Sequence, residues 1–143
     1  MRQRFWVLML SLCLAMLAAA GCGGSNSGPP RVVSLALATQ IDPTTKAPKN
    51  AVEQFPPNTK VMYVSVRIEN PRKGTEVVGK WYYDSQGKGQ FGLVDSSKVT
   101  FPDSKKRYVA FSLTAADTFP AGSYKVAILV DGQVAQEKVF AVR

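Results

Sequence analysis

The stretch PAGSYKVAILVDGQVAQEKVFAV, residues 120 to 142, decides the fold. Over residues 123 to 130, every second side chain is apolar, which is typical of a β-strand with one buried face. The face so defined consists of Tyr124, Val126, Ile128 and Val130. Asp131 and Gly132 follow, and both accept the positive φ of a two-residue turn. The stretch therefore predicts a β-hairpin whose last strand covers residues 133–142, with a bulge near Val139 and Phe140, where the alternation breaks.

The same pattern recurs upstream and predicts strands at residues 32–38, 60–69, 76–84 and 107–113. The inward residues that it predicts are Val33, Leu35, Leu37, Met62, Val64, Val66, Ile68, Val77, Trp81, Tyr83, Val109, Phe111 and Leu113; the outward ones include Tyr63, Ser65 and Arg67. A glycine-rich hairpin turn separates KWYYD from QFGLV. No stretch of ten or more residues has helical spacing. Short strands separated by turns predict an all-β sandwich or barrel.

One connection, residues 39–59, is long for a compact domain and contains four prolines. The prolines exclude a central strand or a helix there. Two interpretations stay open. The segment is either a meandering edge, held by Val52 and Phe55 over the open end of the sandwich, or a recognition loop.

Two aromatic residues distinguish a sandwich from a barrel. Trp81 lies on a central strand, and Tyr124 starts the penultimate strand after the corner FPAGSY, as in a tyrosine corner. The closing run, with Gly-x-Tyr, Asp-Gly and Phe-x-Val, resembles the last hairpin of bacterial immunoglobulin-like domains. The resemblance implies a single immunoglobulin-like (fibronectin III-like) antiparallel β-sandwich of about seven strands over residues 32–143. That fold hosts many functions, so it does not specify one.

The first residues have a different character. Arg2 and Arg4 precede FWVLMLSLCLAML, thirteen uncharged residues at positions 5–17. This run is too short to cross a bilayer core, which needs about 20 apolar residues, but it suits a secretory signal peptide. The segment that follows Cys22, GGSNSGPP, has the composition of a flexible tether.

The sequence AAAGC, which ends at Cys22, resembles the lipobox of bacterial lipoproteins. The resemblance implies that a signal peptidase recognises Ala19, Ala20 and Gly21, and that the Cys22 sulfur carries a diacylglyceryl group. Ala19 stands where the family usually has leucine. Residues 1–21 are then a cleaved helical signal peptide and residues 22–31 the lipidated cysteine with its Gly/Ser/Pro tether. The alternatives are a plain secretory signal with an incidental cysteine, or an uncut membrane anchor.

The resemblance also implies a location in the cell envelope. In Gram-negative members of the family, an aspartate after the cysteine favours retention at the inner membrane. Gly23 occupies that position, which indicates the outer membrane in a Gram-negative cell and the outer face of the cytoplasmic membrane otherwise.

Composition excludes several kinds of chemistry. The chain has no histidine, and its cysteines, Cys13 and Cys22, both precede the predicted domain. A disulfide framework, a Cys/His zinc site and a Cys-His nucleophile are therefore excluded there. The motifs GKGQFG (87–92) and SQGK (85–88) lack the helix that phosphate binding or a Ser-x-x-Lys nucleophile requires. The predicted strand ends and turns hold the capping carboxylates Asp84, Asp95, Asp103, Asp117 and Asp131.

These observations predict no catalytic residue, no metal site and no cofactor apart from the covalent lipid on Cys22, and hence no enzyme. The formal net charge is +8, with runs at Arg72-Lys73 and Lys105-Lys106-Arg107. We interpret both runs as solvated loops, because no basic stripe interleaved with aromatic residues indicates nucleic-acid binding.

A candidate binding face follows from the predicted fold, in which strands 76–84 and 123–130 are neighbours. Its outward residues are Val78, Lys80, Tyr82, Lys125, Ala127 and Leu129. Such a mixture can dock a protein or stack a sugar on Tyr82, or it is merely an amphipathic outer face. The predicted function is that of a membrane-anchored envelope lipoprotein with a non-catalytic binding or assembly module for an envelope protein or glycan. A cell-surface glycan-binding domain is the alternative prediction, and an envelope enzyme is the prediction with the least support.

Overall fold

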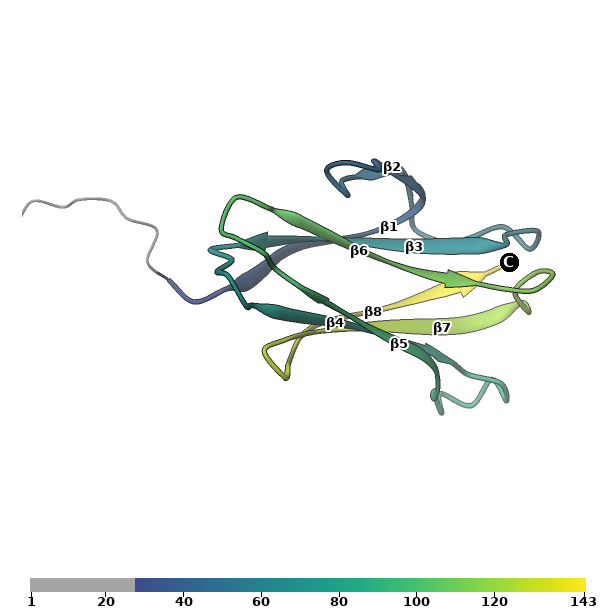
Figure 1. The fold of residues 1–143 in the computed structure, drawn as a ribbon. Coiled ribbons are helices and arrows are strands. Elements are labelled where there is room, and N and C mark those ends of the chain that lie inside the picture. The colour runs from purple at the N-terminus through teal and green to yellow at the C-terminus, as the bar shows by residue number, and fades with distance from the viewer. Residues whose placement is uncertain (1–27) are drawn as a thin grey trace, which may run out of the picture.

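A computed structural model describes residues 28–143, and over these residues the chain forms eight β-strands and no helix (Figure 1). The strands are β1 (Arg31–Ile41), β2 (Pro48–Val52), β3 (Val61–Glu69), β4 (Glu76–Tyr83), β5 (Gly92–Thr100), β6 (Tyr108–Thr114), β7 (Gly122–Val130) and β8 (Gln133–Val142). The signal peptide, Ala19, Ala20, Gly21 and Cys22 predicted from the sequence lie outside the described residues.

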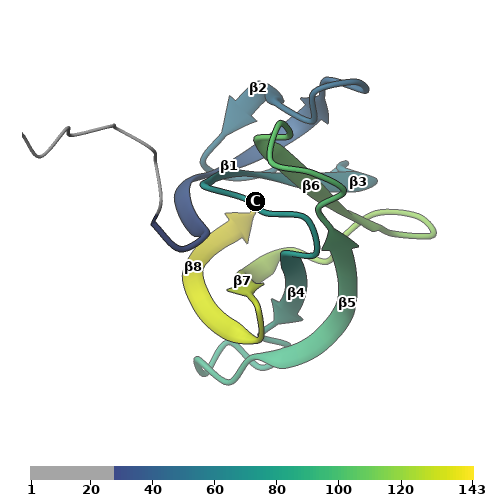
Figure 2. The ribbon, with the colours of Figure 1, turned by 60° about the vertical axis from the view of Figure 1, so that its left-hand side comes forward.

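The strands form two antiparallel sheets that pack face to face (Figures 1 and 2). The first sheet has the order β2-β1-β3-β6 and the second has the order β5-β4-β7-β8. The predicted closing hairpin is confirmed: β7 pairs with β8 through a turn at Asp131 and Gly132, whose φ angles are 48° and 85°. Phe55, in the connection from β2 to β3, makes a parallel bridge to Val142 of β8 and so links the two sheets at one side.

The inward faces of both sheets form one hydrophobic core. All the predicted inward residues of β3, β4, β6 and β7 are buried or packed against this core. Its largest fully buried side chains are Trp81, Tyr124, Phe55 and Phe101. Phe140 joins them from β8, because its ring stacks on Tyr124 at 5.7 Å and meets Trp81 edge-on at 6.3 Å. Phe55 also meets Phe140 edge-on at 5.6 Å, so aromatic rings from β4, β7, β8 and the β2–β3 connection form one cluster within the core.

Tyr124 forms the corner that the sequence predicts. Its hydroxyl donates a hydrogen bond of 2.8 Å to the carbonyl of Pro120, four residues upstream. Burial, with a smaller contribution from the neighbouring Tyr83, raises the pKa of Tyr124 to about 12. The hydroxyl therefore stays protonated and keeps donating at any physiological pH.

One predicted orientation in the first sheet is wrong, and one outward residue is unexpectedly covered. Val33 is 40% exposed instead of inward, because a bulge between Val32 and Ser34 shifts the register of β1 against β3. Val32 packs against the core in its place. Ser65 points outward as predicted but is buried, and its hydroxyl donates to the carbonyl of Lys46 at 2.7 Å. The loop that joins β1 to β2 therefore folds back over the outer face of the first sheet.

The predicted connection 39–59 contains more regular structure than expected. β1 continues to Ile41, and β2 pairs with it from Pro48 to Val52. Phe55 is fully buried and Val52 is partly buried against the core, as the edge interpretation predicts. Pro48 fits a strand because β2 lies at the edge of its sheet, where a missing N–H breaks no ladder.

Two bulges in the second sheet lie where the sequence analysis did not place them. In β8 the extra residue is Ala135, since Gln136 lies opposite Ile128 and Val134 opposite Leu129; the predicted bulge near Val139 and Phe140 is wrong. Without a bulge there, Phe140 points inward and Val139 outward.

The second bulge lies in β5, where Asp95 pairs with Trp81 and Leu93 with Tyr82. Asp95 therefore lies inside a strand and does not cap a turn as predicted. The strand itself extends the expected hairpin after QFGLV to Thr100. It is an edge strand that packs little, which explains why its sequence shows no clear alternation.

Candidate functional site: the outer face of the second sheet

The structure brings the predicted binding-face residues together on the outer face of the second sheet. β4 and β7 are neighbours, and their register pairs Val78 with Leu129, Lys80 with Ala127, and Tyr82 with Lys125. These residues alternate with the buried Val77 and Trp81 of β4 and Val126 and Ile128 of β7. Their positions on one face follow directly from the period of the strands, and their role in binding stays a prediction.

The row that contains Tyr82 extends across all four strands. Leu93 of β5 pairs with Tyr82, and Val139 of β8 pairs with Lys125. Leu93 is 59% exposed and Val139 is 58% exposed, although both are large aliphatic residues. We refer to Leu93, Tyr82, Lys125 and Val139 as the contact row.

The sequence analysis missed both ends of the contact row. Leu93 belongs to a strand whose pattern is weak, and the orientation of Val139 depends on the position of the bulge in β8. A signal was present in Leu93 itself, since QFGLV follows the predicted glycine-rich turn and its apolar residues have no inward alternation to explain them.

Lys125 is held at the centre of the contact row. Its ammonium nitrogen lies 4.8 Å from the centre of the Tyr82 ring, 5.4 Å from that of Phe91 and 3.5 Å from Oε1 of Glu137. Cation–π attraction and the ion pair together keep this side chain over the aromatic rings. The row therefore presents a cation framed by apolar side chains, and one face of the Tyr82 ring is already covered.

The other rows of this face are less suited to contact. Ala127 lies between Lys80 and Glu137 in the register and is only 2% exposed. Val78 and Leu129 are partly buried, while their neighbour Val134 on β8 is 62% exposed. The predicted residues Val78, Lys80 and Leu129 thus lie beside the contact row. Their side chains are less exposed than Leu93 and Val139 at its ends.

The loop between β4 and β5 explains the glycine-rich motif. The Asp84 carboxylate accepts hydrogen bonds from the backbone N–H groups of Gln86 and Lys88, both at 3.2 Å, and of Gly89 at 2.6 Å. Gly87 and Gly89 have positive φ, which the turn requires. The backbone donors that a phosphate would need are therefore occupied by this carboxylate, and the cap predicted at Asp84 is confirmed.

The pKa of Asp84 reflects the same arrangement. Burial by itself would raise the pKa of this carboxyl, but the hydrogen bonds from Gly89, Lys88 and Gln86 together hold it below its ordinary value. The group is therefore a charged cap and not an acid poised to donate a proton near neutral pH.

Two further carboxylates cap backbone groups as predicted. Asp103 accepts from the backbone N–H of Lys105 at 2.7 Å and of Lys106 at 3.2 Å, and these bonds lower its pKa. Asp131 accepts from the backbone N–H of Glu76 at 2.9 Å. Within residues 28–143, no three His, Cys, Asp or Glu side chains lie close enough to hold a metal ion. In the same range, no helix is long and apolar enough to cross a membrane.

Comparison with known protein families and with curated protein sequences found no match. Among solved structures, an immunoglobulin-like protein from Pseudomonas aeruginosa is 11% identical, with a TM-score of 0.52; the match covers 83% of this chain and 100% of that one. The fold is an immunoglobulin-like β-sandwich. The expected fold class is confirmed, with eight strands in place of about seven.

Weaker likenesses add nothing to this assignment. A hypothetical protein from Pyrococcus horikoshii is 11% identical, with a TM-score of 0.40, and the match covers 84% of this chain and 93% of that one. A β-glucosidase from Listeria innocua is 15% identical, with a TM-score of 0.47, over 80% of this chain but only 16% of the enzyme. At such identities a likeness concerns the fold alone, and immunoglobulin-like sandwiches serve many functions.

Proposed function

We propose that this protein is a lipid-anchored component of the bacterial cell envelope, whose immunoglobulin-like sandwich is a non-catalytic module that binds another envelope protein. The anchor is the lipid on Cys22. The binding surface is the contact row on the outer face of the second sheet. The protein lies at the outer membrane of a Gram-negative cell, or otherwise on the outer face of the cytoplasmic membrane.

Support for the anchor comes from the order of segments along the chain. Positive charge, a thirteen-residue uncharged run, small residues and a cysteine follow one another within residues 1–22. Among the described residues 28–143, the buried core cluster extends from Leu37 to Val142. Cys22 thus precedes the segment that supplies the core, which is the order along the sequence that an anchored domain requires.

The observation that carries the binding role is the exposure of Leu93 and Val139 on either side of Tyr82 and Lys125. Apolar side chains on the outside of a sheet are costly for solubility unless a partner covers them. Protein interfaces combine exposed aliphatic and aromatic residues with a few polar groups, and this row has that composition.

The same row favours a protein over a glycan. A sugar stacks on an open aromatic face, but the Lys125 ammonium lies over the Tyr82 ring at 4.8 Å. Stacking there requires this side chain to leave both the ring and Glu137. A protein partner with an acidic side chain can instead pair with Lys125 while its apolar residues cover Leu93 and Val139.

Replacement of Cys22 by serine tests the anchor. Cys22→Ser removes the sulfur that would receive the lipid, so we expect a longer, unprocessed chain that incorporates no labelled fatty acid. Electrophoretic mobility and fatty-acid labelling in intact cells measure both effects. Ser25→Ala, three residues further on, is the matched control and should be processed and labelled normally. A Cys22→Ser chain that is still processed and membrane-bound contradicts the anchor.

The contact row is tested by photo-crosslinking in native membranes. A photoreactive phenylalanine at Tyr82 keeps the aromatic ring, and we expect it to crosslink one envelope protein that the same group at the exposed Ser112, on the first sheet, does not reach. Leu93→Ser with Val139→Ser should weaken this crosslink about tenfold or more, because both side chains lie in the contact. Both residues are exposed, so the fold should survive.

The control variant is Val33→Ser, which removes a 40% exposed valine from a different face. It should leave the crosslink unchanged. Equal crosslinking from Tyr82 and Ser112, or an undiminished crosslink in the Leu93→Ser and Val139→Ser variant, overturns the proposed surface. Retardation in polysaccharide gels that depends on Tyr82, without any protein crosslink, establishes the glycan alternative instead.

A further inference from the structure

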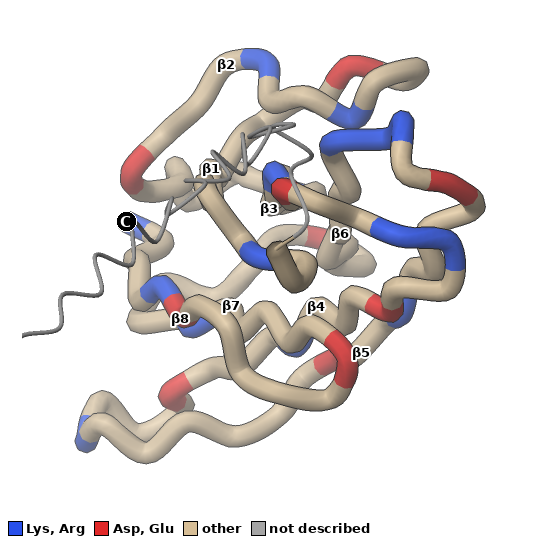
Figure 3. Tube along the Cα trace, turned by 90° about the vertical axis from the view of Figure 1, so that its left-hand side faces the viewer, with Lys and Arg blue, Asp and Glu red and all other residues tan. Residues whose placement is uncertain are grey.

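Two basic loops meet at the end of the sandwich where β1 begins, which we call the N-terminal end. The connection from β3 to β4 carries Arg72 and Lys73, and the connection from β5 to β6 carries Lys105, Lys106 and Arg107. The two loops are in contact around a hollow of about 240 Å³ that Arg72 and Arg107 both line. In Figure 3, which looks onto this end, blue segments gather on the side of β6. The two runs, separate in sequence, thus form one basic surface.

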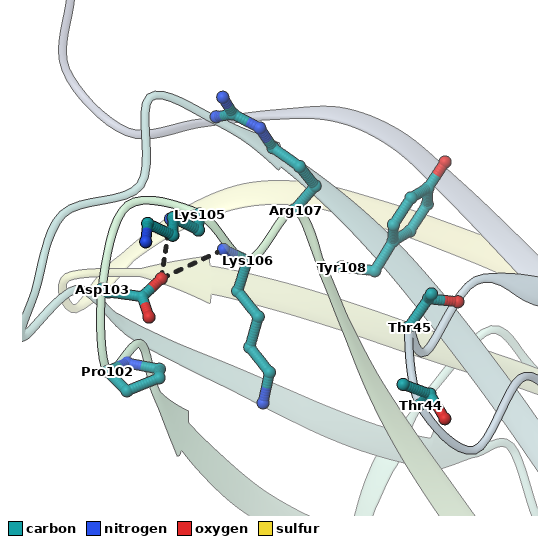
Figure 4. Close-up of a pocket in the computed structure, with 8 residues that line it drawn as sticks. All are labelled: Thr44, Thr45, Pro102, Asp103, Lys105, Lys106, Arg107 and Tyr108. Atoms are coloured by element: carbon teal, nitrogen blue, oxygen red, sulfur yellow. Dashed lines mark hydrogen bonds between the residues drawn. The ribbon is translucent and has the colours of Figure 1, made fainter.

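A larger open hollow of about 470 Å³ adjoins this surface. It lies between the β5–β6 loop and Thr44 and Thr45, from the β1–β2 loop that folds over the first sheet. In Figure 4 the side chain of Lys106 extends into the hollow between Pro102 and Thr44, and the guanidinium of Arg107 points the opposite way. Ammonium and hydroxyl groups around an open hollow suit the phosphate of a small anionic group.

Acidic side chains at this end neutralise the surface only in part, and Asp103 is the one that lies in the same loop as Lys105 and Lys106. The acidic side chains are Glu69, Glu76, Asp103 and Asp131, and Asp42, which caps Thr44 and Thr45 beside the larger hollow and pairs with Lys49 at 3.2 Å. Glu69 pairs with Arg31, and Glu76 pairs with Lys98 at 3.0 Å. Asp131 caps the backbone at Glu76, and Asp103 accepts the backbone N–H groups of its own loop. The side chains of Arg72, Lys73, Lys105, Lys106 and Arg107 have no carboxylate partner among the described residues.

The N-terminal end is also the end at which the chain leaves towards Cys22. The guanidinium of Arg72 donates to the carbonyl of Gly28 at 3.3 Å, so the first described residue lies against the basic surface. Gly28 follows Cys22 by six positions, and even a fully extended chain of that length spans only about 20 Å. A nine-residue strand such as β3 is about 30 Å long, so the opposite end of the sandwich lies beyond the reach of that chain from Gly28.

We propose that the basic surface of the N-terminal end docks on the anionic headgroups of the membrane to which Cys22 is anchored. The inference rests on the proposed lipid anchor. Anionic lipid phosphates match the five unpaired cations in charge, and they lie within reach of the short chain between the anchor and the domain. The lipid and the basic surface then act as two attachments that orient the sandwich with its strands pointing away from the bilayer.

The first test omits the anchor. The chain from Gly23 to Arg143, which contains the whole core, is mixed with vesicles of phosphatidylcholine alone or with phosphatidylglycerol, and the bound fraction is measured by sedimentation. We expect binding only to the anionic vesicles. Lys105→Gln with Lys106→Gln should reduce it about 25-fold, because each basic residue near an anionic surface contributes about fivefold. Added salt should weaken it further.

The matched control is Lys60→Gln with Lys88→Gln, which removes the same charge from exposed positions at the opposite end. This variant should bind as the unaltered chain does. Equal binding to both kinds of vesicle, or an equal loss in both variants, overturns the proposal. So does tighter binding to single-stranded DNA or an acidic polysaccharide at the same salt, since the surface then serves another anion.

The second test uses the lipidated full chain in the same vesicles. A fluorophore on a cysteine at Ser104, in the β5–β6 loop, should be quenched by headgroup nitroxides, and one at Ser85, in the β4–β5 loop, should not. Equal quenching at both sites overturns the orientation. If Cys22 carries no lipid, the anchor fails alone, because the sedimentation measurement still decides whether the basic surface binds anionic headgroups.

Discussion

At the scale of single residues, Gly79 shows how closely the two sheets approach. It lies on β4 between Val77 and Trp81, at an inward position. A Cβ atom there would come within 2.5 Å of Cγ of Phe111, which reaches across from the first sheet. The Phe111 ring therefore packs directly on the glycine backbone, and its 3% exposure depends on the missing side chain.

Gly79→Ala should destabilise the domain by about 1–3 kcal/mol, because the added methyl forces the Phe111 ring out of its packed position. The midpoint of denaturant unfolding measures this loss. Gly92→Ala, on the neighbouring β5, is the matched control, since its nearest atom is 3.9 Å away. Equal midpoints for the two variants contradict the packing argument. Phe111→Leu in the Gly79→Ala background should cost less than in the native chain.

At the scale of elements, the loop between β4 and β5 is organised by one carboxylate. Asp84 is only 5% exposed, yet three backbone N–H groups of its own loop satisfy it. The loop in turn sets where β5 begins and hence where Leu93 meets Tyr82. A capping residue at the end of β4 thus helps to build one end of the contact row.

The lowered pKa of Asp84 predicts how stability depends on pH. The folded state favours the charged carboxylate, so this contribution is complete above the unfolded pKa of about 4 and is lost as the pH falls through the lower, folded pKa. Asp84→Asn should therefore reduce the unfolding midpoint at pH 7, and by much less near pH 3. Thermal unfolding at both pH values measures the difference.

The comparison variant is Asp103→Asn. Asp103 caps the exposed β5–β6 loop at the N-terminal end of the sandwich, with two backbone hydrogen bonds. It should have a smaller effect at pH 7 than Asp84→Asn. A loss of stability in Asp84→Asn that is the same at both pH values contradicts the electrostatic explanation and indicates packing instead.

At the scale of the whole molecule, the two proposed surfaces are separated along the strands. Tyr82 lies six residues from the start of β4 at the N-terminal end, a distance of about 20 Å along a strand. If the basic end docks on the bilayer, the contact row stands clear of the headgroups and is open to a partner. In these proposals the anchor sets the location, the basic loops set the orientation, and the outer face selects the partner.

The strands that carry the core were predictable because their alternation is local. Met62, Val64, Val66 and Ile68 on β3 face inward as their spacing predicts, and β4 and β7 lie side by side as the closing motif implies. That spacing also placed Tyr82 and Lys125 on the same outer face, and the structure shows that they pair. The ends of the contact row were not predictable, because Leu93 and Val139 depend on bulges that shift one strand against its neighbour.

The sequence by itself determined the β-sandwich, its closing hairpin and the candidate anchor at Cys22, because alternation, turn residues and a signal-like leader are properties of neighbouring residues. Only the tertiary structure decided which edges are exposed, why position 79 is glycine, how the β1–β2 loop buries Ser65, and that Arg72 and Arg107 lie together. These features arise from strand register and from contacts between segments distant in the chain, which no local pattern records.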